Sequence, residues 1–200
     1  MSAKDLMVDL ESLGTEYPVP IVQIGACYFN RYSGQIGKEF LVTIDIFDKD
    51  MDKFCYEIRT LKWWLRQSPD AIQSVMHGKE KMHHALDMFR TFASGASCIW
   101  SHATFDFVAL QNAFKVFGIN PFAYKTAKDI RTLTSLARLP KDATENDGVK
   151  HNALDDCKYQ VKYCVKCFNI LKHLGYKSKQ KEDKCRESIL LAQSPTDVQS

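Results

Sequence analysis

The chain has 200 residues, of which 45% are hydrophobic and 26% are charged, and its formal net charge is +3. This length suits one domain with a real core, and the mild positive charge permits a nucleic-acid partner without indicating one. No apolar run approaches a membrane span, and the N-terminus lacks the pattern of a signal peptide. Seven cysteines without such a signal are typical of reduced thiols. We therefore expect a cytoplasmic protein without a membrane partner.

The first apolar run, residues 6–8, predicts a buried strand, and Asp9 and Glu11 stand at its end. Because strand side chains alternate with a period of two, both carboxylates should point to the same side. Adjacent carboxylates repel each other unless a divalent cation binds between them, and their oxygen atoms suit Mg²⁺ or Mn²⁺. A strand that runs into a polar loop is the alternative, since the Asp-x-Glu pattern is common.

Two more strands should complete an antiparallel meander. Residues 21–29 are apolar on both faces, as in a central strand, and residues 40–46 alternate like a half-exposed strand. The polar segment 30–34 between them predicts a hairpin turn. Residues 47–58 have no regular pattern.

The rest of the chain alternates helices with short strands. We predict helices over 60–67, 69–78, 80–93, 105–117, 130–139 and 152–174, and strands over 97–101 and 127–130. Gly175 should end the last helix. The resulting fold is α/β, a mixed sheet covered by helices. We expect a domain over residues 1–175 and a polar tail over residues 176–200 with the composition of a disordered segment.

Two further groups of acidic residues follow in the chain. Asp106 comes after Phe105 at the start of the helix that follows the fourth strand. His151 and Asp156 open the last helix. Taken alone, the first is explained by an aspartate that complements a helix dipole, and the second by a capped helix start.

Together these segments resemble the DEDD exonucleases of the DnaQ-like, ribonuclease-H-like superfamily, in the histidine-bearing (DEDDh) subclass. The Asp-x-Glu motif is Asp9 and Glu11, the second motif is Phe105-Asp106, and the third, His-x-Ala-x-x-Asp, spans residues 151–156. The tyrosine-bearing subclass would need a tyrosine at Asn152. The resemblance covers residues 4 to 172 and implies a ribonuclease-H-like sheet.

A closer likeness is to the phage exodeoxyribonuclease A group and the mycobacterial-type exoribonucleases. It is carried by Trp63-Trp64, by residues 104–107 and by residues 128–132. The chain departs from this group at His102, where a Gly-Asn-type segment is expected. That difference bears on how the terminal nucleotide is held.

The resemblance implies a metal-dependent 3′–5′ exonuclease that releases mononucleotides from single-stranded 3′ ends or overhangs of DNA or RNA. Hydrolysis would use two divalent cations, Mg²⁺ or Mn²⁺, about 3.5–4 Å apart. By the same likeness, Asp9 would bridge both ions, Glu11 and Asp156 would bind one, and Asp106 the other. His151 would take the proton from the attacking water.

Substrate contacts are implied at a second set of residues: Leu10, Trp63, Trp64, His102, Phe105, Asp129 and Arg131. The adjacent tryptophans cannot be equally buried on one helix, so we expect one in the core and one free to stack on a base. A helix cap and a surface ion pair would explain Asp129 and Arg131 nearly as well.

Two questions stay open at this point. The alternative to an enzyme is a catalytically silent nucleic-acid-binding module with the same fold, although such a module has no need of four acids and a histidine. The sequence also leaves a homodimer open. By contrast, Cys164 and Cys167 have no second cysteine pair at ligand spacing, so we interpret them as core thiols rather than a zinc site.

Overall fold

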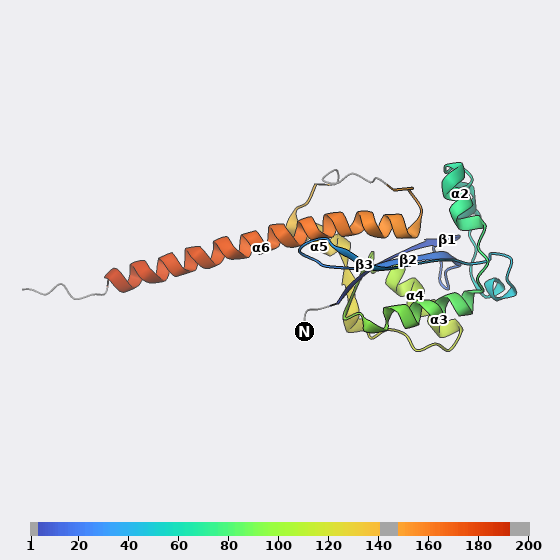
Figure 1. Cartoon of the computed structure of the whole chain (residues 1–200), viewed down its shortest axis with the longest axis horizontal. Coiled ribbons are helices and arrows are strands. Elements are labelled where there is room, and N and C mark those ends of the chain that lie inside the picture. The colour runs from blue at the N-terminus through green and yellow to red at the C-terminus, as the bar shows by residue number, and fades with distance from the viewer. Residues whose placement is uncertain (1–3, 141–147, 193–200) are drawn as a thin grey trace, which may run out of the picture.

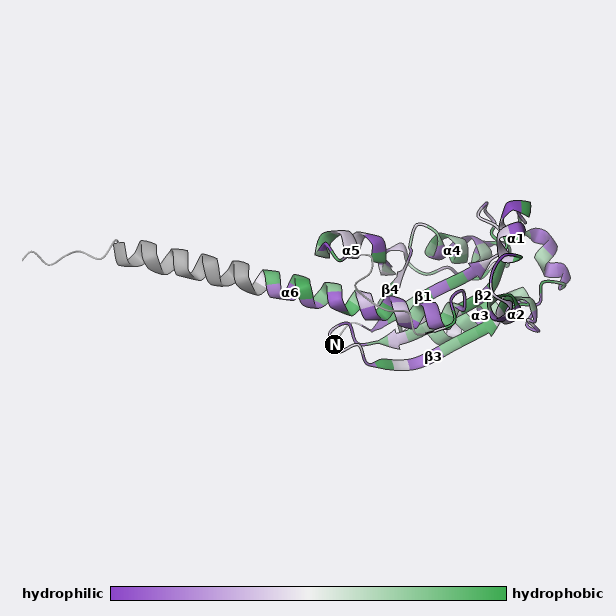
Figure 2. Ribbon diagram, turned by 90° about the horizontal axis from the view of Figure 1, so that it is seen from above, coloured by the Kyte–Doolittle hydropathy of each residue, from purple (hydrophilic) through white to green (hydrophobic). Residues whose placement is uncertain are grey.

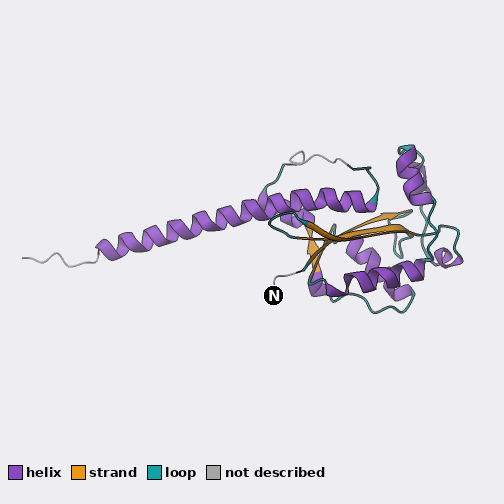
Figure 3. Ribbon diagram, viewed as in Figure 1, coloured by secondary structure: helices purple, strands orange, loops and turns teal. Residues whose placement is uncertain are grey.

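A computed structural model describes the backbone of residues 4–140 and 148–192 and the side chains of residues 4–140 and 148–175. Its centre is a five-stranded mixed sheet with the order β3-β2-β1-β4-β5 (Figures 1 and 3). Strands β1, β2 and β3 pair antiparallel, whereas β4 pairs parallel with both β1 and β5. This confirms the predicted meander, the mixed sheet and the α/β class.

Most elements lie where the sequence predicts them. Strand β2 has the predicted range, while β3 begins at Ile36 rather than Phe40, and the segment predicted to be irregular contains a short 3₁₀ helix. The strands are β1 (Asp5–Ser12), β2 (Ile21–Phe29), β3 (Ile36–Thr43), β4 (Cys98–Ser101) and β5 (Ala127–Asp129). The α-helices are α1 (Ile58–Trp64), α2 (Pro69–Met76), α3 (Met82–Phe92), α4 (Asp106–Val116), α5 (Ile130–Ala137) and α6 (Ala153–Ala192), and the 3₁₀ helices are η1 (Lys49–Lys53), η2 (Ala93–Gly95) and η3 (Tyr124–Thr126).

Helix α6 is longer than predicted, because it continues through Gly175 to Ala192. A glycine costs a helix only about 1 kcal/mol relative to alanine, so it does not end a helix by itself. The outer half of α6 extends away from the sheet (Figure 1). The predicted helix end was therefore wrong, while the boundary at residue 175 between a domain and a tail stays a prediction. No helix in the described ranges is long and apolar enough to span a bilayer.

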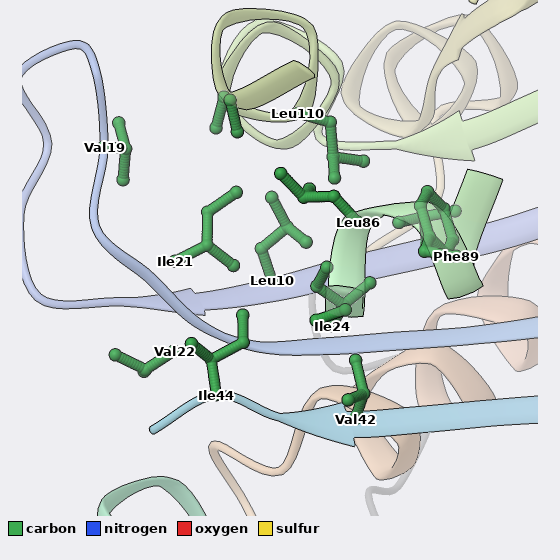
Figure 4. Packing of buried hydrophobic residues seen from close by; sticks show 14 of the residues in the cluster. Leu10, Val19, Ile21, Val22, Ile24, Val42, Ile44, Leu86, Phe89 and Leu110 are labelled. Atoms are coloured by element: carbon green, nitrogen blue, oxygen red, sulfur yellow. The ribbon is translucent and has the colours of Figure 1, made fainter. Parts of the chain in front are cut away.

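Helices cover both faces of the sheet, with α3 and α4 on one face and α5 and α6 on the other (Figure 1). The alternation of β1 divides its residues between the two cores. Leu6, Val8 and Leu10 pack with α3 and α4, and Figure 4 shows part of this core around Leu10. Met7 packs on the other face, in a core to which α6 contributes apolar side chains such as Val161. Along the described part of α6, hydrophobic and hydrophilic residues are interspersed (Figure 2). Asp9 and Glu11 share the parity of Met7 and therefore face α6.

A buried carboxylate also lies at the opposite end of this face of β1. Asp5 is only 3% exposed. Its Oδ2 accepts a hydrogen bond of 2.8 Å from Arg31 Nε, and its Oδ1 accepts from Arg31 Nη2 at 2.5 Å and from Trp100 Nε1 at 2.8 Å. Protein donors therefore satisfy both oxygen atoms of Asp5.

The start of α6 lies directly on β2. A Cβ atom on Gly25 would stand 2.2 Å from the carbonyl carbon of Ala153, so only glycine fits there. Beside this contact, the buried amide of Gln23 accepts a hydrogen bond of 2.7 Å from Ala153 N and donates to Thr43 Oγ1 and Ser74 O. These bonds join β2, β3, α2 and α6 at one point and fix the position of the first turn of α6.

The Gly25→Ala substitution should destabilise the fold, because the new methyl group forces the backbone of α6 away from the sheet. Overpacking of this kind costs about 1–3 kcal/mol in the free energy of unfolding. The variant should also lose nuclease activity, because the displaced helix carries Asp156. Thermal unfolding and a nuclease assay measure the two effects.

Gly175→Ala is the matched control, since a Cβ atom added at this position on α6 would meet no atom of another element within 4 Å among the described residues. This substitution should leave stability unchanged or raise it slightly, because alanine favours helix. Equal effects of the two substitutions would contradict the proposed packing constraint.

Candidate active site

A pocket of about 320 Å³ lies at the edge of the sheet where β1 and β4 end. These two strands run parallel, so their carboxyl ends meet there, and the first turn of α6 covers the same edge. All five residues predicted for catalysis line this pocket. Its lining consists of Asp9, Leu10, Glu11, His102, Phe105, Asp106, His151, Asp156, Tyr159, Gln160 and Tyr163.

The potential metal-binding atoms form two adjacent groups. A carboxylate oxygen of Asp9, one of Asp106 and a ring nitrogen of His102 lie within 4.8 Å of one another. A carboxylate oxygen of Glu11, one of Asp156 and a ring nitrogen of His151 do the same. Segments far apart in the sequence therefore supply each group.

Burial strongly disfavours the charges of these acids. Asp9 and Glu11 are each 8% exposed, and Asp106 is 3% exposed. Burial, followed by the nearby carboxylates of Asp106, Glu11 and Asp156, raises the pKa of Asp9 well above its usual value. Burial and the same kind of repulsion raise the pKa of Glu11 to about 8. Burial raises the pKa of Asp106 to about 7, although a backbone hydrogen bond from His102 and the charge of Arg131 oppose it.

Gln160 holds Asp9 in place from the second turn of α6. Its Nε2 donates a hydrogen bond of 2.6 Å to Asp9 Oδ1, and the residue is 4% exposed. Its Oε1 is buried and has no hydrogen-bond partner among the described residues. Buried carboxylates with few protein donors and an unpaired amide oxygen in one pocket form an oxygen-rich set that fits a divalent cation.

The turn that carries Asp106 is closed by its own hydrogen bonds. His102 N donates to Asp106 Oδ2 at 2.9 Å. Asp129 Oδ1 accepts a bond of 3.2 Å from Ala103 N, while Asp129 Oδ2 accepts from Thr132 N and so caps α5. Asp129 is thus a helix cap that also steadies the turn.

Arg131 is exposed and lies beside the pocket rather than in it. It lines an adjoining hollow of about 170 Å³ together with His102, Tyr159 and Tyr163, and the last three also line the main pocket. A substrate role for Arg131 stays a prediction.

His151 has a left-handed backbone conformation, with φ at 64°. For a residue with a side chain this conformation costs about 1–2 kcal/mol. His151 N donates a bond of 3.0 Å to Asp156 Oδ2, and His151 O accepts one of 3.4 Å from Ser74 Oγ. These bonds offset the cost and orient His151 and Asp156 jointly.

The two tryptophans of α1 pack edge-on against His151, with ring centroids 4.8 Å away for Trp63 and 5.9 Å for Trp64. Trp64 is 1% exposed and donates from Nε1 to Ser12 O, whereas Trp63 is 42% exposed. This confirms that one is core and the other accessible. Leu10 belongs to the core and only borders the pocket, while Phe105 is half-buried in its wall.

Sequence reasoning missed the supporting residues Gln23, Gly25 and Gln160. Gln23 had a usable signal, since a lone amide in an apolar strand must find hydrogen-bond partners. Gln160 also had one, because it follows Asp156 by one helical turn and so lies on the same face of α6. Gly25 had none, since its role depends on which helix packs on the strand.

Residues 4–168 match the family model of the 3′-5′ exoribonuclease Rv2179c-like domain. The chain belongs to this family. The family confirms the predicted 3′–5′ exonuclease class of enzyme and the likeness to mycobacterial-type exoribonucleases. No curated protein sequence matches the chain significantly.

Solved structures of a DnaQ-like DEDD exonuclease share the fold. Escherichia coli exonuclease I in complex with a dT13 oligonucleotide matches with a TM-score of 0.64 and 14% identity over 88% of this chain and 43% of that one. A further exonuclease I structure gives 0.63 and 15% over 88% and 44%, and the zinc-bound E. coli enzyme with single-stranded DNA gives 0.62 and 12% over 88% and 43%. The chain thus spans less than half of the exonuclease I chains. The likeness confirms the ribonuclease-H-like fold.

Without a cation, the free energy of unfolding should fall as the pH rises from about 4 to about 8. The usual pKa values are 3.8 for Asp106 and 4.5 for Glu11, and folding raises them to about 7 and about 8. The folded state therefore binds more protons than the unfolded state in this range. Stabilisation present at low pH is lost as the pH passes through the raised values. Thermal unfolding in chelator across this range measures it.

Added Mn²⁺ should raise the melting temperature more at pH about 8 than at pH about 5, because the deprotonated carboxylates bind the cation. Glu11→Gln should flatten the pH dependence in chelator, since it removes one of the carboxyl groups whose pKa folding raises. A melting temperature that stays constant across this pH range in wild type would contradict the raised pKa values.

Proposed function

We propose that the chain is a metal-dependent 3′–5′ exonuclease that removes mononucleotides from single-stranded 3′ ends, with RNA as the preferred substrate. The observation that carries this proposal is the pair of adjacent acidic groups in one pocket, each with two carboxylates beside a histidine. The family description, which names an exoribonuclease, supports RNA. The DNA oligonucleotides bound to exonuclease I make DNA the alternative to be tested.

The two groups would hold two divalent cations, with Asp9 between them, Glu11 and Asp156 on one side, and Asp106 on the other. The chemistry that bound cations supply at such a site is a lowered pKa of water and stabilisation of the charge on the phosphate. The buried acids suit this task, because burial and then mutual repulsion raise their pKa values, and bound positive charge favours their ionised forms.

The remaining side chains would bind and orient the substrate. His151 lies next to Glu11 and Asp156, where its ring can accept the proton of the attacking water. The exposed face of Trp63 borders this histidine and offers a surface on which a base can stack. A pocket of about 320 Å³ is at the lower end of the range for ligand sites, which suits one nucleotide at a frayed end rather than a duplex.

The direct test uses single-stranded RNA and DNA of one sequence, each labelled at the 5′ end, with Mg²⁺, with Mn²⁺ and with chelator. We expect a ladder that shortens from the 3′ end, faster for RNA, and no products in chelator. A circular strand should resist cleavage. The absence of products with either metal would overturn the enzyme proposal in favour of a binding module, and faster cleavage of DNA would overturn the preference for RNA.

His151→Ala should lower kcat by about 10²–10⁴-fold, the usual effect of losing a general base. The loss should shrink at high pH, where hydroxide needs no base. Rate measurements across pH for both proteins check this. If the two pH profiles had the same shape, His151 would not be the base.

Trp63→Ala should raise KM by about 5- to 150-fold, since stacking on one base contributes about 1–3 kcal/mol, and should leave stability nearly unchanged. The neighbouring Trp64→Ala should instead lower the free energy of unfolding by about 3–5 kcal/mol, because Trp64 is buried. Steady-state kinetics and urea unfolding separate the two roles. An unchanged KM in Trp63→Ala would remove this residue from the substrate site.

A further inference from the structure

We propose that a ring nitrogen of His102 is itself a ligand of the cation held by Asp9 and Asp106. This nitrogen would make that position bind first-row transition ions more tightly relative to Mg²⁺. The inference rests on the proposed function, because it concerns one of the two cation positions. It assigns His102 to the metal rather than to the nucleotide, for which the sequence had suggested it.

The geometry brings three different elements to one point. Asp9 lies on β1, Asp106 opens α4, and His102 stands in the loop between β4 and α4. One oxygen of each acid and one imidazole nitrogen lie within 4.8 Å of one another. Ligands at about 2.1 Å from one ion are separated by about 3–4 Å, so small rotations of these side chains bring them to one ion.

Hydrogen bonds fix the backbone at His102 but not its imidazole ring. His102 N donates to Asp106 Oδ2 at 2.9 Å, and the following residue, Ala103, donates from its backbone N to Asp129. The first bond ties His102 to the acid that would share its ion, and the second steadies the turn that follows. Among the residues that the structure describes, no hydrogen bond reaches the imidazole ring, so its nitrogen is available to a ligand.

A second, separate atom in the same pocket also lacks a partner within the described part of the chain. Gln160 Oε1 is buried without a hydrogen bond, although Gln160 Nε2 is engaged with Asp9. A buried amide oxygen normally has a donor, so its position indicates a polar ligand such as a water bound to the ion. His102 and Gln160 thus flank Asp9 with a free nitrogen and a free oxygen.

The expected selectivity follows from the ligand type. Mg²⁺ prefers oxygen ligands and retains several waters, whereas imidazole nitrogen suits first-row transition ions. An all-carboxylate position would discriminate little against Mg²⁺. A histidine at this position would therefore shift the balance towards Mn²⁺ and Co²⁺.

The test is pulsed electron paramagnetic resonance of the full chain loaded with Mn²⁺, which detects ¹⁴N nuclei bound directly to the ion. We expect a ¹⁴N coupling in wild type that is lost in His102→Asn and kept in His151→Asn. Mn²⁺ titration should show an affinity about 10-fold or more weaker in His102→Asn, since even residues that only support a ligand are worth that much. Mg²⁺ affinity, measured by competition, should change less.

His84→Asn is the matched control, because His84 is exposed on α3, on the other face of the sheet, and pairs with Glu80. It should leave the ¹⁴N coupling and the affinities unchanged, and circular dichroism should show that every variant is folded. Mn²⁺ bound to wild type without ¹⁴N coupling would overturn the inference alone. A coupling that persists in His102→Asn would do the same. Failure of wild type to bind Mn²⁺ at all would instead overturn the proposed function.

Discussion

The contact between the backbones of α6 and β2 at Gly25 determines where half of the candidate site lies. Asp9 pairs with Gly25 across the two strands, so a helix seated on Gly25 also passes over Asp9. Because α6 is positioned by this contact, its residues Asp156 and Gln160 face β1. His151 lies just before the first turn of α6. The amide of Gln23 fixes the height of the helix above the sheet. Any displacement of α6 would separate the acids that must share a ligand.

The cluster of four carboxylates in the pocket lowers the stability of the fold unless positive charge neutralises it. Two like charges about 4–5 Å apart repel by about 3–4 kcal/mol at an effective dielectric constant of about 20, and four carboxylates meet in this pocket. Gln160 supplies the one side-chain donor that the described residues offer to Asp9. The structure therefore gives up stability at this edge of the sheet, and the left-handed backbone of His151 adds to that cost.

The sheet could be predicted from local patterns, whereas the five central site residues were predicted from the joint resemblance of three motifs to a known family. Apolar runs and alternation locate strands, and the Asp-x-Glu and His-x-Ala-x-x-Asp motifs lie at element ends that the fold brings to one edge. What could not be predicted depends on which surfaces meet. Gly25 reveals its purpose only beneath α6, and the length of α6 depends on a glycine that the helix tolerates. The ring of His102 reaches Asp9 through a turn whose shape no pattern encodes.

Buried carboxylates lie at both ends of one face of strand β1, and their surroundings differ. At its start, Asp5 is surrounded by the guanidinium of Arg31 and the indole of Trp100, which complete the needs of both oxygen atoms. At its end, Asp9 and Glu11 are also buried, but no cationic side chain among the described residues forms an ion pair with them. Whether a buried aspartate has a structural role or can bind a ligand therefore depends on the hydrogen-bond donors that neighbouring segments supply. At one end of β1 the charge of the carboxylate is therefore neutralised by the protein itself. At the other end the charges still need a positively charged ligand, and only such a site can take part in chemistry.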